Sequence, residues 1–486
     1  MSAPSAICLK FSSEITEPVR SRISYAFRVF AAIYNHRVAE AELNPEAICC
    51  IYGKTLPNAR GSRSFHIPAL YRPRSLGSGT ATLAKRRYGN EDIFLAHGID
   101  KATGNPDWLG EIFEWISCSH ELGVTSRDYV GRIPDSDMIF GRLGISPRKP
   151  YATLLMSWME NSLRNGNAAE TLPKAPSPVP SAAHIVVCSH DIDFHHVSRM
   201  PTLVRLIKNL GISCTRSGSW SFFSANSTMI LKMLTGKRVG DYLPPLLEAI
   251  EKCEFRSTLF AVTRRGHRRD PNYRIQDIAP HLREAARKGF SVDLHGSYTS
   301  ITEAGTLTPE SRDLENMMGK KPLGSRQHWL RFDHHEKLFQ AVERAELVFD
   351  STLGFSKTVG FRNGASFAFP PYDFSKERPH KFLEIPLVLM DVSLEDASRS
   401  LRVDAQEIAE EVLRESRKWS WGGVAVLWHN PIEPLEVPDE INHVFWNCAN
   451  QRHQFAEKWM SATEFLTHCI ARYQNAGLLE DVRINA

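Results

Sequence analysis

Short apolar segments alternate with amphipathic segments over the second part of the chain. The amphipathic segments, such as 242–253 and 404–418, place apolar residues at helical spacing. The apolar segments resemble strands buried on both faces of a parallel sheet, and there are seven of them, at 184–188, 256–262, 290–294, 326–331, 347–349, 382–389 and 423–428. This alternation predicts an α/β fold with a parallel sheet covered by helices, either open or closed into a barrel.

The first part of the chain is patterned differently. Apolar runs at 7–11 and 48–52 flank a stretch, 18–34, whose apolar residues fall on one helix face. This strand, helix and strand order predicts a smaller α/β domain of unassigned role at 1–165.

A linker separates the two parts. Residues 166–183 contain four prolines among Ala, Ser and Asn and few large apolar residues, which is a linker composition. We therefore expect the barrel-like part, 184–486, to end in a C-terminal helix and to fold without the N-terminal domain.

Composition narrows the class of protein. With 42% hydrophobic and 23% charged residues in 486, the chain is globular rather than disordered. A net charge of +4 is too small over this length to indicate a nucleic acid or an anionic membrane surface as partner. The nine cysteines show no C-x-x-C spacing, and the sequence contains no signal peptide or membrane span, so we expect reduced thiols and a cytoplasmic location.

Polar residues follow the predicted strands at the positions where parallel β/α folds carry their chemistry. Histidines and aspartates are the ones that recur there: Asp191, Asp193, His295, His328, Asp391 and His429. Neutral imidazoles with one carboxylate suit a divalent transition metal, because such a ligand set leaves positions open for water and substrate. A single Asp at such a position could instead cap a helix, and a single His could belong to the core.

At these residues the chain resembles the polysaccharide deacetylase superfamily, over about residues 183–435. These are metal-dependent enzymes that remove N-acetyl groups from chitin-like oligosaccharides and related glycans. The segment Ser-His-Asp-Ile-Asp at 189–193 resembles the first motif of the family, which implies that Asp191 is the general base and Asp193 a metal ligand. In the second motif His295 is present but Thr299 stands where a second ligand His is expected, and His328 is the nearest replacement.

The later motifs imply the remaining roles. The block 350–364 is similar to the region of the family's arginine motif, which makes Arg362 the partner that orients Asp191. Asp391 resembles the carboxylate that supports the catalytic histidine, and Leu-Trp-His at 427–429 resembles the closing motif, with His429 as general acid. The resemblance implies an irregular (β/α)7 barrel, and it is strongest to a variant group with an additional N-terminal domain.

The resulting expectation is a zinc-dependent hydrolase that removes N-acetyl or O-acetyl groups from a carbohydrate in glycan or surface-polysaccharide biosynthesis. Two alternatives stay open. Asp191 and Asp193 also form the D-x-D of glycosyltransferases that hold a cation against a nucleotide diphosphate, and loss of the second histidine would fit a glycan-binding protein without catalysis.

Overall fold

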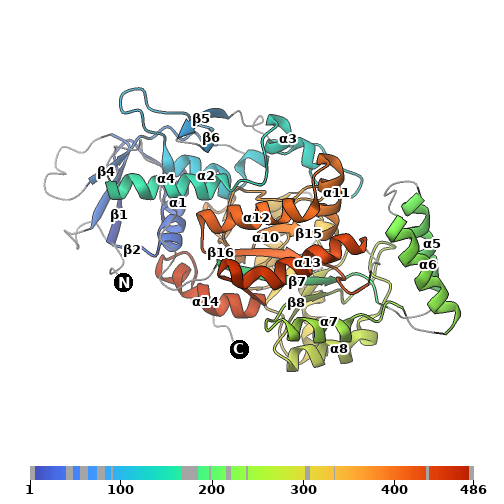
Figure 1. The fold of residues 1–486 in the computed structure, drawn as a ribbon. Coiled ribbons are helices and arrows are strands. Elements are labelled where there is room, and N and C mark those ends of the chain that lie inside the picture. The colour runs from blue at the N-terminus through green and yellow to red at the C-terminus, as the bar shows by residue number, and fades with distance from the viewer. Residues whose placement is uncertain are drawn as a thin grey trace.

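The computed structural model describes residues 6–39, 47–54, 64–73, 83–88, 91–165, 184–195, 199–214, 220–236, 239–301, 307–332, 334–433 and 437–480. It consists of a barrel, an N-terminal unit packed against the barrel, and a helical hairpin that projects from the barrel on the other side (Figure 1). The predicted linker, 166–183, lies outside the described residues.

Each of the seven predicted apolar segments overlaps a strand of one parallel sheet. The strands are β7 (His184–Ile192), β8 (Thr258–Ala261), β9 (Ser291–Gly296), β10 (Gly324–Gln327), β11 (Phe349–Asp350), β14 (Leu383–Glu384), β15 (Leu387–Met390) and β16 (Gly422–Leu427). Strands β7, β8 and β16 are buried along their whole length, which explains the apolar runs that they contain in the sequence.

The order of the strands shows that the sheet curls into a barrel. That order is β14-β11-β10-β9-β8-β7-β16-β15, so β14 and β15 stand at opposite ends of it. Only Ile385 and Pro386 separate these two strands in the chain, and the two edges of the sheet therefore meet. The segment 383–390 pairs with β11 through its first half and with β16 through its second half. The predicted irregular seven-stranded barrel is confirmed.

Helices cover the outside of the barrel and join its strands. They are α7 (Leu243–Lys252), α8 (Ile275–Arg287), α9 (Leu307–Met318), α10 (His335–Arg344), α11 (Asp391–Leu401), α12 (Ala405–Trp419), α13 (Asp439–Gln451) and α14 (Ala462–Asn475). Two additional helices, α5 (Arg199–Ile212) and α6 (Trp220–Leu234), follow β7 and form the projecting hairpin. A short strand, β17 (Glu457–Met460), pairs with β7, and β12 (Tyr372–Asp373) pairs with β13 (Arg378–Pro379).

The N-terminal unit is also α/β, as predicted. Its parallel sheet has the order β2-β1-β3-β4. The elements of the unit are β1 (Ala6–Phe11), α1 (Val19–Tyr34), β2 (Arg37–Val38), β3 (Ile48–Tyr52), β4 (Ser64–Ile67), β5 (Ala84–Tyr88), β6 (Glu91–Leu95), α2 (Trp108–Ile116), α3 (Ile139–Leu143) and α4 (Tyr151–Asn165). Within the described part of the chain, no helix combines the length and the apolar character that crossing a bilayer requires.

The N-terminal unit and the barrel share one hydrophobic core. A single cluster of buried side chains includes Phe27 and Trp115 from the N-terminal unit and Phe349 and Leu427 from the barrel. Polar contacts reinforce this packing: the Tyr25 hydroxyl donates to the carbonyl oxygen of Pro370 at 2.7 Å, and Arg22 pairs with Glu377 at 2.6 Å. The expectation that the barrel folds without the N-terminal unit does not agree with this shared core.

We therefore expect a fragment of residues 184–486 to be insoluble or to lack a cooperative unfolding transition. Removing the N-terminal unit would expose barrel side chains that are now buried against it, at a cost of about 25 cal/mol per Å² of apolar surface. Urea unfolding followed by circular dichroism, with the full chain as control, measures this. A fragment with a sharp transition of its own would show that the barrel is an independent domain.

Candidate active site

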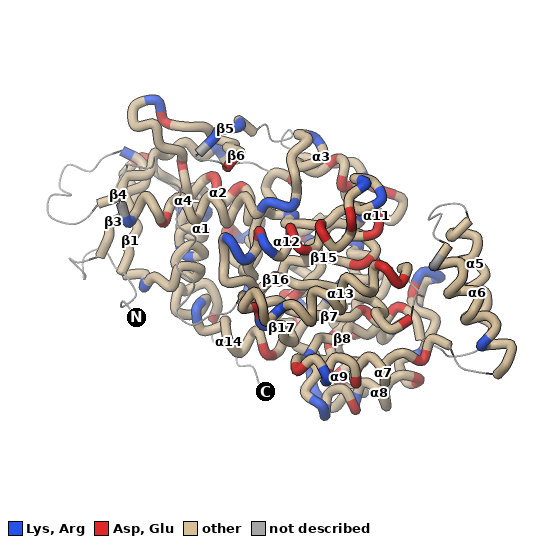
Figure 2. The backbone as a smooth tube through the Cα atoms, viewed as in Figure 1, with Lys and Arg blue, Asp and Glu red and all other residues tan. Residues whose placement is uncertain are grey.

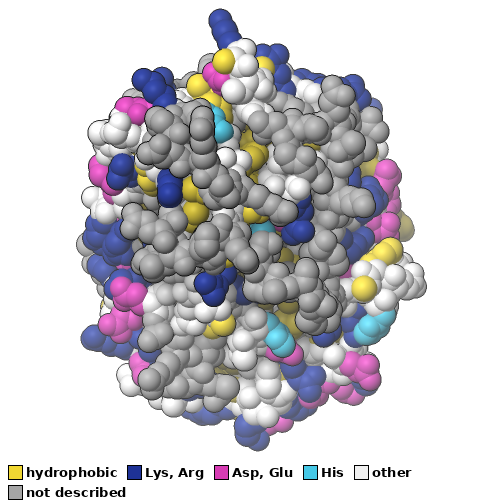
Figure 3. Space-filling model, turned by 90° about the vertical axis from the view of Figure 1, so that its left-hand side faces the viewer, with side chains coloured by type: hydrophobic (Ala, Val, Ile, Leu, Met, Phe, Trp, Pro, Cys, Tyr) yellow, Lys and Arg dark blue, Asp and Glu magenta, His cyan; other side chains and the backbone are white. Residues whose placement is uncertain are grey.

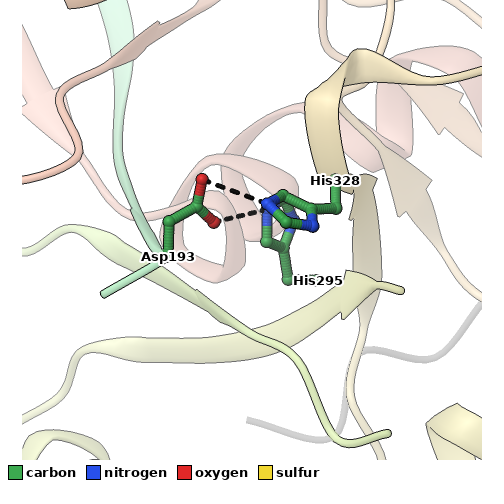
Figure 4. Close-up of side chains that lie close together, drawn as sticks. All are labelled: Asp193, His295 and His328. Carbon is green, nitrogen blue, oxygen red and sulfur yellow. Dashed lines mark ion pairs between the residues drawn. The ribbon is translucent and has the colours of Figure 1, made fainter. Parts of the chain in front are cut away.

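Three side chains at one rim of the barrel form a group with the composition of a metal site. Asp193 follows β7, His295 lies in β9 and His328 follows β10, so all three lie at the carboxyl ends of the strands. The Nε2 atom of His295 is 3.2 Å from Asp193 Oδ1, and the Nε2 atom of His328 is 3.3 Å from Asp193 Oδ2 (Figure 4). The structure therefore brings together the three residues predicted as metal ligands.

The backbone beside this group is held in an unusual conformation. Directly after His328, Trp329 and Leu330 adopt left-handed conformations with φ of 65° and 48°. For residues other than glycine this costs about 1–3 kcal/mol each, and such strain is concentrated at functional sites. The turn ends β10 at the point where His328 enters the rim.

The orientation of the two imidazoles fits a divalent metal ion. His295 Nδ1 donates to the carbonyl oxygen of Arg326 at 2.8 Å, which directs its Nε2 lone pair toward Asp193. His328 Nδ1 lies 3.9 Å from the carboxylate of Asp270. Neither His295 Nε2 nor Asp193 Oδ1 has a hydrogen bond, although both atoms are buried. Donor atoms around a tetrahedral zinc ion are roughly 3.3–3.6 Å apart, close to the observed spacing.

The charges within the group stabilise one another. Burial alone would raise the pKa of Asp193, but His328 and His295 hold it well below its usual value. Burial alone would lower the pKa of His328, but Asp193 and Asp270 raise it to about 9. Without a metal, then, His328 is a cation beside two carboxylates, and metal binding would have to release its proton.

Asp191 is held by a buried arginine from the opposite side of the barrel interior. Its Oδ1 accepts from Nη1 of Arg326 at 2.8 Å. Arg326 has no exposed surface, and its other donors reach Ser189 Oγ, Ser351 O and Ser351 Oγ at 2.8–2.9 Å. The second oxygen of Asp191, Oδ2, is 3.6 Å from His295 Nε2. Asp191 thus presents one fixed oxygen to Arg326 and one oxygen to the three-residue group.

The predicted partnership of Arg362 with Asp191 is not formed. Arg362 pairs with Glu121 of the N-terminal unit at 2.9 Å and 3.0 Å and donates to the carbonyl oxygen of Gly354 at 3.0 Å. It lies in the loop between β11 and β12, and its partner Glu121 belongs to the N-terminal unit, whereas Arg326 lies on a strand. The missed signal was a charged side chain within a buried strand, since all four residues of β10 are buried and Arg326 is one of them.

His429 and Asp391 form a second oriented pair at the same rim. His429 Nδ1 is 2.8 Å from Asp391 Oδ1, and the backbone N–H of His429 donates to Asp391 Oδ2 at 2.9 Å. Burial alone would lower the pKa of His429, but Asp391 raises it to about 10, so the imidazole is protonated at neutral pH. Its Nε2 lies 3.7 Å from Asp193 Oδ2. A proton donor is therefore placed beside the three-residue group.

Two other groups of possible ligands occur among the described residues. Glu343, Asp373 and His380 form one, but Arg378 pairs with Glu343 at 3.0 Å and Lys376 with Asp373 at 3.3 Å, so cationic side chains already neutralise it. In the other group, the imidazoles of His195 and His281 are both 3.9 Å from Asp241 Oδ1, wider than the spacing at Asp193. The group at Asp193 fits a metal best.

Comparison with known proteins gives matches only among solved structures. No protein-family model and no curated protein matches the chain. A probable polysaccharide deacetylase from Pseudomonas aeruginosa PAO1 is 12% identical, with 60% of this chain and 95% of that chain covered and a TM-score of 0.34. Puue allantoinase is 11% identical, with 63% and 96% covered and a TM-score of 0.37. A polysaccharide deacetylase from Bacillus cereus is 10% identical, with 57% and 91% covered and a TM-score of 0.29.

These structures include polysaccharide deacetylases, the superfamily that the sequence motifs resemble. Identities and scores at this level say nothing about chemistry. What the site does has to be inferred from the geometry of its own side chains.

Proposed function

We propose that this chain is a metal-dependent hydrolase that removes N-acetyl groups from the amino sugars of a glycan, in glycan or surface-polysaccharide biosynthesis. One observation carries the proposal: an oriented carboxylate and an oriented imidazolium both face the group formed by Asp193, His295 and His328. Asp191 Oδ2 is 3.6 Å from His295, and His429 Nε2 is 3.7 Å from Asp193. Amide hydrolysis needs a proton acceptor and a proton donor on either side of one reacting carbon.

The ligand set supports zinc. Two imidazoles and one carboxylate are typical of catalytic zinc, with positions left for water and substrate. A divalent ion bound by these three residues would polarise the amide carbonyl and make water more acidic. Asp193 would balance part of the positive charge of the ion.

The side chains of the protein move the protons. Asp191, with Oδ1 fixed by Arg326, accepts at Oδ2 a proton from the attacking water. His429 donates the proton on Nε2 to the nitrogen of the departing amino sugar, while Asp391 holds the imidazole through Nδ1. Acetate and a free amine result. General acid and general base catalysis each contribute about 10² to 10⁴-fold. An O-acetyl ester depends less on His429, since an alcohol leaves more easily than an amine.

The contacts of Asp191 count against a glycosyltransferase. A D-x-D motif needs both carboxylates near the cation and the diphosphate, but one oxygen of Asp191 is already paired with Arg326. A binding protein without catalysis would not require an imidazolium held by Asp391 beside the three-residue group.

The decisive experiment measures zinc content and acetate release together. The reconstituted full chain should hold about one zinc ion at the Asp193 group and release acetate from N-acetylglucosamine oligomers. Binding of uridine diphosphate without acetate release would favour the transferase. Binding of a glycan by a protein that holds no metal would favour the non-catalytic alternative.

Replacing Asp391 with Asn should move the alkaline limb of the pH–rate profile to lower pH. The pKa of His429 is about 10 because Asp391 favours the protonated imidazole. A general acid works only while protonated, so activity falls as pH rises through its pKa, and removing Asp391 brings this fall to lower pH by about 1–3 units. Steady-state kcat from pH 6 to 11 measures the limb.

Glu395→Gln, one helical turn further along α11, is the matched control for the Asp391 variant. It should leave the alkaline limb in place. If the alkaline limb of the pH–rate profile is unchanged in the Asp391→Asn variant, His429 is not the general acid.

A further inference from the structure

The hairpin of α5 and α6 stands apart from the rest of the molecule. It projects from the barrel on the side opposite the N-terminal unit (Figure 1). Its interior is a small cluster of its own, separate from the two cores of the barrel, and consists of Phe194, Leu206, Met229, Met233 and Val239. The hairpin is inserted directly after β7, the strand that carries Asp191 and Asp193.

The hairpin exposes large apolar side chains. Six of the 12 large hydrophobic residues that are exposed in the described part of the chain belong to it: Met200, Val204, Ile207, Trp220, Leu231 and Leu234. Met200, Val204 and Ile207 follow one another at spacings of four and three and therefore share one face of α5. Trp220 is 78% exposed and Leu234 is 73% exposed. We call these six side chains the outer apolar set. This concentration of exposed apolar side chains in one projecting segment favours a docking role for the hairpin.

The same segment carries charge of a single sign. Between Asp193 and Asp241 there are seven Lys or Arg residues and no Asp or Glu, whereas the whole chain has a net charge of only +4. Lys208 and Lys232 are exposed beside the outer apolar set. Figure 2 shows no acidic position on α5 or α6. The opposite end of the molecule, seen in Figure 3, carries acidic and basic side chains together.

Apolar side chains, an exposed tryptophan and purely basic charge together fit an anionic lipid surface. Each Lys or Arg near such a surface adds to the attraction. A second copy of the chain fits less well, because pairing two hairpins would bring like charges together. The helices have 14 and 15 residues, fewer than the roughly 20 that span a bilayer, so they would lie in the interface.

We propose that the outer apolar set of the α5–α6 hairpin docks on an anionic phospholipid membrane. Five residues separate Asp193 from the first residue of α5, which limits their distance to about 22 Å. Docking would therefore bring the barrel rim close to the bilayer. A glycan carried on a lipid would then reach the site; this consequence rests on the proposed function, whereas the docking does not.

Co-sedimentation with vesicles tests the docking without any assay of activity. The full chain should sediment with vesicles of phosphatidylcholine and one-third phosphatidylglycerol, much less with phosphatidylcholine alone, and less in high salt. Two double variants should each bind these vesicles at least about tenfold more weakly than the unchanged protein. One combines Val204→Gln with Leu231→Gln, and the other combines Lys208→Glu with Lys232→Glu.

Matched controls carry the same substitutions at exposed positions elsewhere. Leu401→Gln with Phe455→Gln, and Lys101→Glu with Lys458→Glu, should bind like the unchanged protein. If the variant with Val204→Gln and Leu231→Gln has a lower melting temperature, the variant with Lys208→Glu and Lys232→Glu tests the proposal by itself. Absence of binding to anionic vesicles, or equal loss in the controls, would overturn the proposal. A different result would also overturn it: the protein is a dimer in sedimentation velocity, the hairpin variants are monomers, and none of them binds to vesicles.

Discussion

Replacing Asp191 with Asn should lower kcat by about 10²- to 10⁴-fold while the zinc content of the protein stays unchanged. The amide oxygen of Asn can still accept from Arg326, so the local structure is retained, but the side chain can no longer take a proton from water. The loss should fall on kcat far more than on KM, because the proton is transferred in the transition state. Acetate release and elemental analysis on the same samples measure both quantities.

Asp193→Asn is the informative comparison, since it changes the other carboxylate in the same way. It should lose zinc first and activity as a consequence, because Asp193 faces both His295 and His328. Turnover of Asp191→Asn at the level of the unchanged protein would show that another group is the base. Full zinc retention by the Asp193→Asn variant would show that Asp193 is not a metal ligand.

Replacing either buried arginine with Met should destabilise the protein by about 3–5 kcal/mol, because each change leaves a buried carboxylate without its partner. Loss of Arg326 leaves Asp191 without its partner, and loss of Arg362 leaves Glu121 without its partner. Only Arg326→Met should also lower kcat strongly, because the proton acceptor Asp191 would lose the side chain that fixes its Oδ1. Urea unfolding and steady-state kcat separate the two effects.

The Arg362 variant has a pH signature of its own in stability. Burial would raise the pKa of Glu121, but Arg362 lowers it to about 2. The pair therefore stabilises the native protein above the unfolded pKa of about 4.3, and this contribution disappears as pH falls toward 2. The stability difference between Arg362→Met and the unchanged protein should accordingly shrink from pH 5 to pH 2. A kcat lowered strongly by Arg362→Met and not by Arg326→Met would reinstate Arg362 as the partner of Asp191.

The sequence by itself determined the strands of the barrel and the rim that carries the site. Strands buried on both faces, such as β8 and β16, are apolar at nearly every position, and this local requirement is visible without any partner. Polar residues at the carboxyl ends of such apolar runs stand out in the sequence, because the positions before them are apolar. The structure places Asp193, His295 and His328 together because parallel strands end at one rim.

Only the tertiary structure decided which groups meet across the barrel and between its parts. Sequence spacing could not choose between Arg326 and Arg362, since each lies far along the chain from the carboxylate it pairs with. The common core of the barrel and the N-terminal unit likewise depends on contacts between distant segments, which a linker composition does not reveal. The basic character of this segment was hidden by averaging, because a net charge of +4 over the whole chain conceals a stretch, 194–240, whose sequence has seven Lys or Arg residues and no Asp or Glu. Local periodicity reports the burial of each element, whereas pairing and exposure are properties of the assembled fold.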